Sequence, residues 1–159
     1  MRNYGMVACG DLKKSTAEPA EGRRERTAMT NTWTYNMLTE QIIGAAIEVH
    51  RTLGPGLLEK VYEECLCREL TLRGIPFKRQ VAVPIIYKGE ELATPYRCDL
   101  LVADMVIVEN KSVADFTPID MAQLLGYLKL MDQRLGLLIN FNVKFLKQGI
   151  RRVANGLGE

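Results

Sequence analysis

The chain has 159 residues, of which 47% are apolar and 25% are charged, with 21 Lys and Arg against 19 Asp and Glu. This is the composition of one globular domain, and it excludes collagen, coiled coils and wholly disordered chains. No run of residues approaches the roughly 18 to 20 consecutive apolar positions of a membrane span, which excludes a membrane protein. Four cysteines with no secretory signal ahead of them indicate a reduced, cytoplasmic protein.

The first 28 residues differ in character from the rest of the chain. They contain charged runs such as Glu21–Arg26 and no apolar periodicity, which predicts a disordered tail. Met29 and Met37 precede the first periodic segment and are candidate true starts, in which case the tail is an artefact of an upstream start. Residues 29–159 are expected to form one domain. Without the tail the chain carries 15 basic and 15 acidic residues, so its bulk charge does not favour nucleic acid.

Two helices are predicted after the tail. The first begins at Thr39, which can act as its cap, and stops at Gly54. The second has an apolar stripe that starts at Leu58 and ends near Gly74. Because only a few residues link them, the two helices are expected to pack as a pair.

The hydrophobic period then changes from helical to strand-like. Three strands are predicted as a meander, over Val81–Tyr87, Leu92–Val102 and Met105–Lys111. Pro84 cannot donate a ladder hydrogen bond, which places the first of these strands at a sheet edge. A tight turn at residues 103–104 joins the second and third strands as a hairpin.

A third helix, a buried strand and a last helix follow the meander. Thr117 is a cap and Pro118 occupies the first helical position of a helix that runs through residue 130. The continuous apolar run Leu135–Phe141 predicts a buried strand, and the stripe within Val143–Ala154 predicts the last helix. This order of elements indicates one α/β domain with a mixed sheet flanked by helices.

Three charged residues interrupt the apolar pattern of the strands. Counting out from the hairpin turn, Asp99 and Glu109 are near neighbours on adjacent strands. Glu109 and Lys111 have the same parity, so their side chains share one face of the sheet. Two carboxylates a few ångström apart repel each other unless one is protonated or a cation lies between them. Mg²⁺ suits such a pair because it binds one or two carboxylates together with waters and phosphate oxygens.

Further polar residues accompany these three. Glu59 lies early in the second helix, and Gln123 and Tyr127 lie four residues apart on one face of the third. The alternative interpretation is a structural cluster of ion pairs on a solvated face. The additional residues favour a catalytic site, in which Lys111 polarises an attacking water.

Four short motifs resemble those of a known nuclease superfamily. The segment GLLEKVY at residues 56–62 resembles the signature of the small bacterial GxxExxY proteins, a family assigned to the PD-(D/E)xK nuclease superfamily. Asp99 followed by ENK at 109–111 resembles the D…(D/E)xK core of that superfamily, and QLLGY at 123–127 resembles the QxxxY element of its RecB-like branch. The resemblance covers about residues 39–153 and implies an α-β-β-β-α-β, restriction-endonuclease-like core.

The resemblance also implies a metal centre. Asp99 and Glu109 would ligate Mg²⁺, for which Mn²⁺ could substitute, and the Asn110 carbonyl would be a further ligand. Glu59 would assist either directly or through a water. The implied reaction is hydrolysis of a phosphodiester, driven by charge neutralisation and by a hydroxide-like nucleophile.

The remaining motif residues have implied roles in the same reaction. Lys111 would orient and activate the nucleophilic water. Gln123 and Tyr127 would position the scissile phosphate or the DNA backbone. DNA is the expected partner, and RNA stays open as a substrate, as does the oligomeric state.

A candidate nucleic-acid surface lies near the C-terminal end of the chain. Lys144, Lys147 and Arg151 are spaced by three and four residues, which places them on one face of the predicted last helix. The alternative is a solvated face with cations near a helix C-terminus.

Two functions are compatible with these patterns. The first is a divalent-metal-dependent nuclease that acts on DNA in repair, recombination or defence. The second is a catalytically silent nuclease-fold module that binds nucleic acid or a protein partner. All candidate catalytic positions hold competent side chains, which favours the enzyme.

Overall fold

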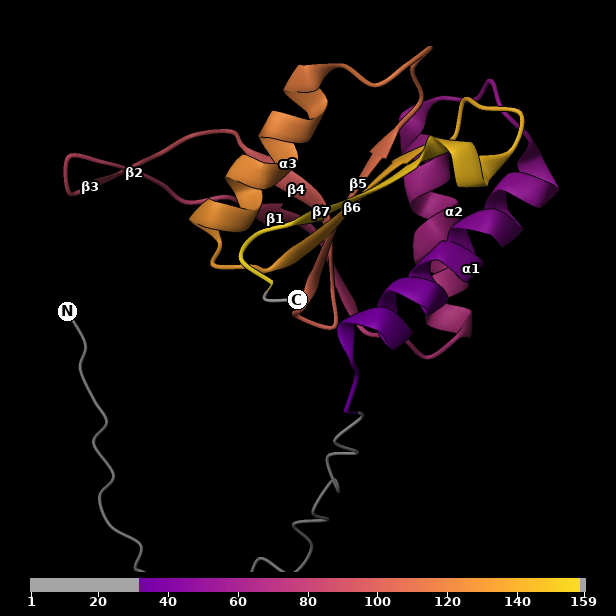
Figure 1. Ribbon diagram of the computed structural model, residues 1–159, viewed down its shortest axis with the longest axis horizontal. Coiled ribbons are helices and arrows are strands. Elements are labelled where there is room, and N and C mark those ends of the chain that lie inside the picture. Colours follow the sequence, from indigo (N-terminus) through magenta and orange to yellow (C-terminus); the bar gives the residue numbers. More distant parts are fainter. Residues whose placement is uncertain (1–31, 158–159) are drawn as a thin grey trace, which may run out of the picture. The chain divides into compact units, whose positions relative to one another are not determined.

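The computed structural model describes residues 32–157 (Figure 1). The predicted disordered tail, residues 1–28, lies outside the described residues, and so does the candidate start at Met29. The elements in chain order are α1 (Tyr35–Leu53), α2 (Glu59–Leu72), β1 (Phe77–Ala82), β2 (Ile85–Tyr87), β3 (Glu90–Leu92), β4 (Arg97–Val102), β5 (Val106–Lys111), α3 (Pro118–Leu130), β6 (Leu135–Asn140), the 3-10 helix η1 (Leu146–Gly149) and β7 (Ile150–Ala154).

Helix α1 begins earlier than the sequence pattern predicts. Thr34 is the N-cap, since its hydroxyl accepts a hydrogen bond from the Met37 N–H at 3.2 Å. Thr39, the predicted cap, lies inside the helix, where its hydroxyl donates to the carbonyl of Tyr35 at 2.8 Å. The helix ends before Gly54, as predicted, and α1 packs against α2 across the short link.

A five-stranded mixed sheet, in the order β1-β4-β5-β6-β7, forms the centre of the domain. β1 pairs antiparallel with β4, β4 antiparallel with β5, and β6 antiparallel with β7. β5 and β6 are parallel because α3 connects them as a crossover. The predicted buried strand is β6, all of whose residues are buried.

The first two predicted strands are each divided into two pieces. β1 ends at Ala82, and the chain leaves the sheet at Pro84, which has no N–H to contribute to a ladder. β2 and β3 then form a separate two-stranded hairpin that projects from the domain (Figure 1). The chain rejoins the main sheet as β4 at Arg97. β1 is an edge strand of the main sheet, as Pro84 predicted.

The prediction of a last helix over Val143–Ala154 is wrong. Its residues form η1 and the strand β7, which pairs with the outer side of β6. Without β7 that side of a fully buried strand would leave N–H and C=O groups without partners. The last residue of η1 is Gly149, and glycine is required there because a Cβ would clash with the carbonyl oxygen of Asn140.

Helices cover both faces of the sheet: α1 and α2 lie on one face and α3 lies on the other (Figure 1). Each interface contains its own apolar core. None of the described helices is long and apolar enough to cross a membrane. The predicted mixed sheet flanked by helices is confirmed, and the arrangement is that of a restriction-endonuclease-like fold.

Candidate active site

The two candidate carboxylates lie where β4 and β5 separate. The register pairs that join these strands extend from the turn only as far as Leu100 and Val108. Beyond that pair, Glu109 Oε1 accepts a hydrogen bond from the Asp99 N–H at 3.0 Å, and Asp99 Oδ2 accepts one from the Asn110 N–H at 2.8 Å. Each carboxylate is therefore bound to the backbone of the other strand, and the hairpin brings the predicted pair together.

Burial disfavours the charged form of both carboxylates. Glu109 is 6% exposed, and its desolvation, followed by the charge of Asp99, raises its pKa to about 8. The pKa of Asp99 is also raised, chiefly by desolvation, although the hydrogen bond from Asn110 acts in the opposite direction. A cation close to the two carboxylates would offset the cost of ionising both.

Lys111 forms an ion pair with the first turn of α3. Its Nζ lies 3.7 Å from Asp120 Oδ1, and both side chains are less than one-fifth exposed. The other oxygen of Asp120 accepts hydrogen bonds from the N–H and the hydroxyl of Thr117, each at 2.8 Å. Asp120 thus closes the capping box of α3 and holds Lys111 at the same time. No local sequence pattern predicts this role of Asp120.

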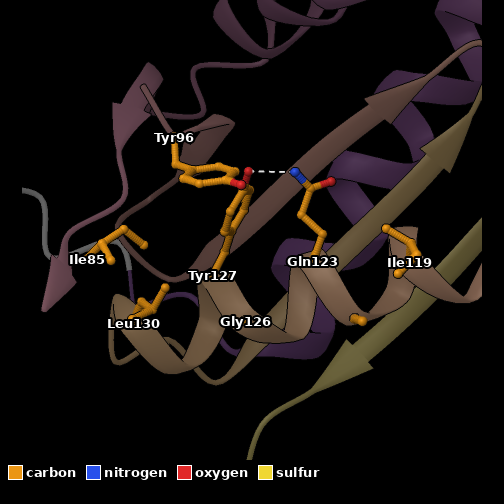
Figure 2. Close-up of a pocket in the computed structure, with 8 residues that line it drawn as sticks. Ile85, Tyr96, Ile119, Gln123, Gly126, Tyr127 and Leu130 are labelled. Atoms are coloured by element: carbon orange, nitrogen blue, oxygen red, sulfur yellow. Dashed lines mark hydrogen bonds between the residues drawn. The ribbon is translucent and has the colours of Figure 1, made fainter. Parts of the chain in front are cut away.

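Gln123 and Tyr127 form a hydrogen-bonded pair on α3. Gln123 Nε2 donates to the Tyr127 hydroxyl at 2.8 Å (Figure 2). Tyr127 is buried, and desolvation together with the charge of Glu109 raises its pKa. Tyr96 packs edge to face against it, with ring centroids 6.4 Å apart. The helical spacing therefore identified a real pair, and Tyr127 lies within electrostatic range of Glu109.

Glu59 is the first residue of α2. Desolvation raises its pKa, while the charge of Lys111 lowers it and the charge of Asp99 raises it. Glu59 and Asp99 also line one polar cavity, of about 680 Å³, between α2 and the β1–β4 edge of the sheet. The structure thus brings Glu59 within electrostatic range of both Lys111 and Asp99.

Tyr62, the last residue of the GLLEKVY motif, holds the link that precedes Glu59. Its hydroxyl donates to the Gly54 carbonyl at 2.7 Å and accepts from the Leu57 N–H at 3.1 Å. Its ring stacks on Phe141, which follows β6, with centroids 4.5 Å apart. The tyrosine of the motif therefore holds the loop that leads into Glu59.

A network of hydrogen bonds and ion pairs surrounds Asp99 and includes residues that the sequence pattern did not predict as part of the site. Gln80 on β1 donates from Nε2 to Glu63 Oε2 at 3.1 Å and to Asp99 Oδ1 at 3.4 Å. The backbone of Gln80 has a φ of +48°, a left-handed conformation that is costly for a residue with a side chain. Arg79 in turn binds the carboxylates of Glu63 and Glu64. No local pattern signals this network, because it depends on how β1 pairs with β4.

Asn110 lies between the candidate residues Glu109 and Lys111. Its main chain belongs to the ladder between β5 and β6, in register with Ile139. Its side chain is fully buried, and neither its Oδ1 nor its Nδ2 has a hydrogen-bond partner among the described residues. The Asn110 carbonyl as a metal ligand stays a prediction.

Two of the predicted basic contacts belong to a different surface from the carboxylates. Lys144 and Lys147 line a cavity together with His50 and Arg51, at the C-terminal turn of α1. They do not share a helical stripe with Arg151, because the helix that would form the stripe is absent.

The pairing of β5, β6 and β7 places Arg151 on the same face of the sheet as Glu109. Register pairs align it with Leu138 on β6, and align Leu138 with Glu109 on β5. Side chains in register share a face, so Arg151 lies two strands from Glu109, roughly 10 Å away, on the same side. Its guanidinium lies 5.5 Å from the centroid of the Phe116 ring, which precedes α3.

The donors at the separated strands suit a hard divalent cation. Asp99 and Glu109 supply two carboxylates with raised pKa values. Both oxygens of Asp99 accept a hydrogen bond, whereas Oε2 of Glu109 has no hydrogen-bond donor among the described residues. No group of three His, Cys, Asp or Glu among the described residues is arranged to hold a metal by itself. A Mg²⁺ ion would therefore depend on the carboxylate pair together with waters and substrate oxygens, which is its usual coordination.

Comparison with protein families agrees with this geometry. A family model described as the PD-(D/E)XK nuclease superfamily matches residues 36–153. The chain belongs to this superfamily. The matched residues extend from α1 into β7 and include every candidate residue described above. No curated protein and no solved structure matches the chain. Membership of the PD-(D/E)XK nuclease superfamily implies a hydrolytic nuclease.

Proposed function

We propose that this protein is a divalent-metal-dependent nuclease that hydrolyses phosphodiester bonds in DNA. The observation that carries the proposal is the reciprocal pair of Asp99 and Glu109, because burial and mutual repulsion disfavour two ionised carboxylates there and a cation would offset that cost. The family match supports hydrolysis of nucleic acid. Mg²⁺ is the proposed ion, and Mn²⁺ is expected to substitute for it.

The residues of the site have complementary roles in this proposal. Asp99 and Glu109 hold the metal, with Asn110 and Glu59 as further ligands or water-mediated contacts. When bound, the metal neutralises phosphate charge and lowers the pKa of a bound water.

The residues next to the carboxylates act on water and on the substrate. Lys111, held by Asp120, orients the attacking water and offsets charge on the phosphate. The Gln123 and Tyr127 pair positions the scissile phosphate, and Arg151 contacts a neighbouring phosphate. Phosphate contacts of this kind supply affinity that falls with salt concentration.

The finer grouping of the chain rests on its motifs. GLLEKVY at 56–62 supports membership of the GxxExxY family, and QLLGY at 123–127 supports membership of the RecB-like branch. Roles in repair, recombination or defence are compatible with either group. All of these belong to the proposal.

Cleavage of labelled DNA tests the proposal directly. Linear duplex, circular duplex and single-stranded DNA, with a matched RNA, are incubated with the protein in Mg²⁺, Mn²⁺ or EDTA. Wild type is compared with Asp99→Ala and Lys111→Ala, and with Asp104→Asn as a control. Asp104 lies in the turn of the same hairpin, and among the described residues its exposed carboxylate pairs only with Lys78. Metal-dependent cleavage that is lost in the first two variants and kept in the control is the expected result.

The alternative is a catalytically silent nuclease-fold module that binds nucleic acid or a protein partner. A folded wild type that cleaves none of these substrates would favour it. Mg²⁺ binding is then measured by calorimetry on wild type and on Asp99→Ala. Equal affinity in the two proteins would refute the metal site itself.

A further inference from the structure

A groove of about 390 Å³ lies beside the candidate active site, between α3 and the segment that carries Tyr96 (Figure 2). Ile85 and Tyr96 form one side of it, and α3 forms the other side with Ile119, Gly126 and Leu130. Ile119 and Tyr96 are 74% and 50% exposed, so both offer apolar surface to a group that enters the groove. The volume falls within the range of small-molecule sites.

Gly126 leaves open space in the groove. A glycine inside a helix costs about 1 kcal/mol relative to alanine. A Cβ at Gly126 would meet no atom of the described chain within 4 Å, so internal packing does not require glycine there. Gly126 lines the groove, so the helix backbone there is accessible to a group that enters it.

The walls of the groove select the chemistry of its occupant. Most of the lining is apolar, and the exposed ring of Tyr96 offers a surface on which a flat group can stack. Gln123 adds one polar edge: its Nε2 is used by Tyr127, but its Oε1 has no hydrogen-bond partner among the described residues. An aliphatic side chain of a partner would not use this oxygen. A nucleobase has two apolar faces and a hydrogen-bonding edge, and it matches the lining.

The groove shares two residues with the candidate active site. Gln123 and Tyr127 line the groove, and Tyr127 is within electrostatic range of Glu109. Asp120, which holds Lys111, lies one turn before Gln123 on the same helix. A strand whose phosphate lies at Lys111 therefore has the groove beside it for a neighbouring base.

We propose that this groove binds an unpaired base of the nucleic-acid strand, which makes the substrate single-stranded or locally unpaired. The inference rests on the proposed function and adds the substrate class to it. A base that remains paired and stacked in a duplex cannot enter a groove of this kind. Tyr96 is the stacking residue, and Gly126 provides the space.

Binding is tested by fluorescence anisotropy with a labelled single-stranded DNA, its duplex, and an abasic strand of equal length. CaCl₂ or EDTA replaces Mg²⁺ during these measurements. We expect wild type to bind the intact strand more tightly than the abasic strand, which carries the same phosphates. Base stacking on an aromatic ring corresponds to roughly 5-fold to 150-fold in affinity. Tyr96→Ala should lose this preference, and Tyr96→Phe, which keeps the ring, should retain it.

Gly126→Ala separates a ligand site from a structural feature. Alanine is the better helix former, so the melting temperature should rise, while affinity for the intact strand should fall. Opposite signs in the two measurements support the proposal. An unchanged affinity, together with equal binding of intact and abasic strands, would overturn it.

Three further outcomes are distinguishable. Metal-dependent cleavage that is as fast on duplex as on single strands, and unaffected by Tyr96→Ala, overturns the base site and leaves the nuclease. Sedimentation showing a dimer that Gly126→Ala dissociates assigns the groove to a second copy of the chain, and also overturns the base site. Failure of wild type to bind or cleave any nucleic acid overturns both proposals.

Discussion

Replacing Glu109 by glutamine should remove the pH dependence of stability that this carboxyl group imposes. Gln is nearly isosteric with Glu, and its Oε1 can still accept the hydrogen bond from the Asp99 N–H. The substitution removes only the charge. Because the folded-state pKa of Glu109 lies above its ordinary value, the protonated form is favoured in the folded protein. The contribution of this group to stability is complete below about pH 4.5 and is lost as pH rises through 8.

The size of the effect follows from the two pKa values. With a pKa of 4.5 in the unfolded chain and about 8 in the folded protein, Glu109 lowers the free energy of unfolding by roughly 3 to 4 kcal/mol between pH 5 and pH 8. Glu109 is 6% exposed, so solvent screening reduces this value little. A bound divalent cation favours the ionised form, and Mg²⁺ should therefore flatten the pH dependence of wild type.

The assay is urea unfolding at pH 5, 6.5 and 8, in EDTA and in MgCl₂. Glu109→Gln should become more stable than wild type in EDTA as pH rises, and Mg²⁺ should not stabilise it. Glu91→Gln, at an exposed carboxylate on β3, is the control and should follow wild type. Parallel pH curves for wild type and Glu109→Gln in EDTA would refute the assignment of a buried, protonated carboxyl.

Three further predictions concern single contacts. Asp120→Asn keeps an acceptor for the helix cap but removes the charge that holds Lys111. The kcat for DNA cleavage should therefore fall roughly 10-fold to 100-fold, with little change in melting temperature. An unchanged kcat would contradict a positioning role for Asp120. Tyr62→Phe should lower the free energy of unfolding in urea by about 1–3 kcal/mol, because the hydrogen bonds of its hydroxyl with Gly54 and Leu57 are both lost. A loss below about 0.5 kcal/mol would contradict the role of Tyr62 in holding this link. Arg151→Gln should weaken DNA binding and reduce its salt dependence more than Lys147→Gln, since only Arg151 is aligned with Glu109; equal effects would contradict the alignment.

The position of the candidate carboxylates follows from short-range rules. A tight turn and period-2 alternation suffice to predict that Asp99 and Glu109 are neighbours, and the structure joins each to the backbone of the other strand. Helical spacing likewise predicts that Gln123 and Tyr127 share a face, where they form a hydrogen bond. The chemical roles of these residues stay predictions.

The errors occur where a distant partner decides the local structure. Val143–Ala154 has a helical apolar spacing, but Ile150–Ala154 forms a strand because it pairs with the free edge of β6. The basic stripe was lost with that helix, and Arg151 reaches the Glu109 face through sheet register instead. Thr39 fits a cap by residue type, yet a turn of helix precedes it.

The sequence alone therefore determined the elements whose signals lie within a few residues: most helices and strands, the mixed α/β class, and the hairpin that pairs Asp99 with Glu109. Only the tertiary structure decided that Gln80 reaches Asp99 from β1, that Asp120 holds Lys111, and that Gly126 opens a groove beside Tyr96. The physical reason is that turn geometry and side-chain period act along the chain, whereas strand order and helix docking depend on burial and hydrogen bonding between segments far apart in sequence.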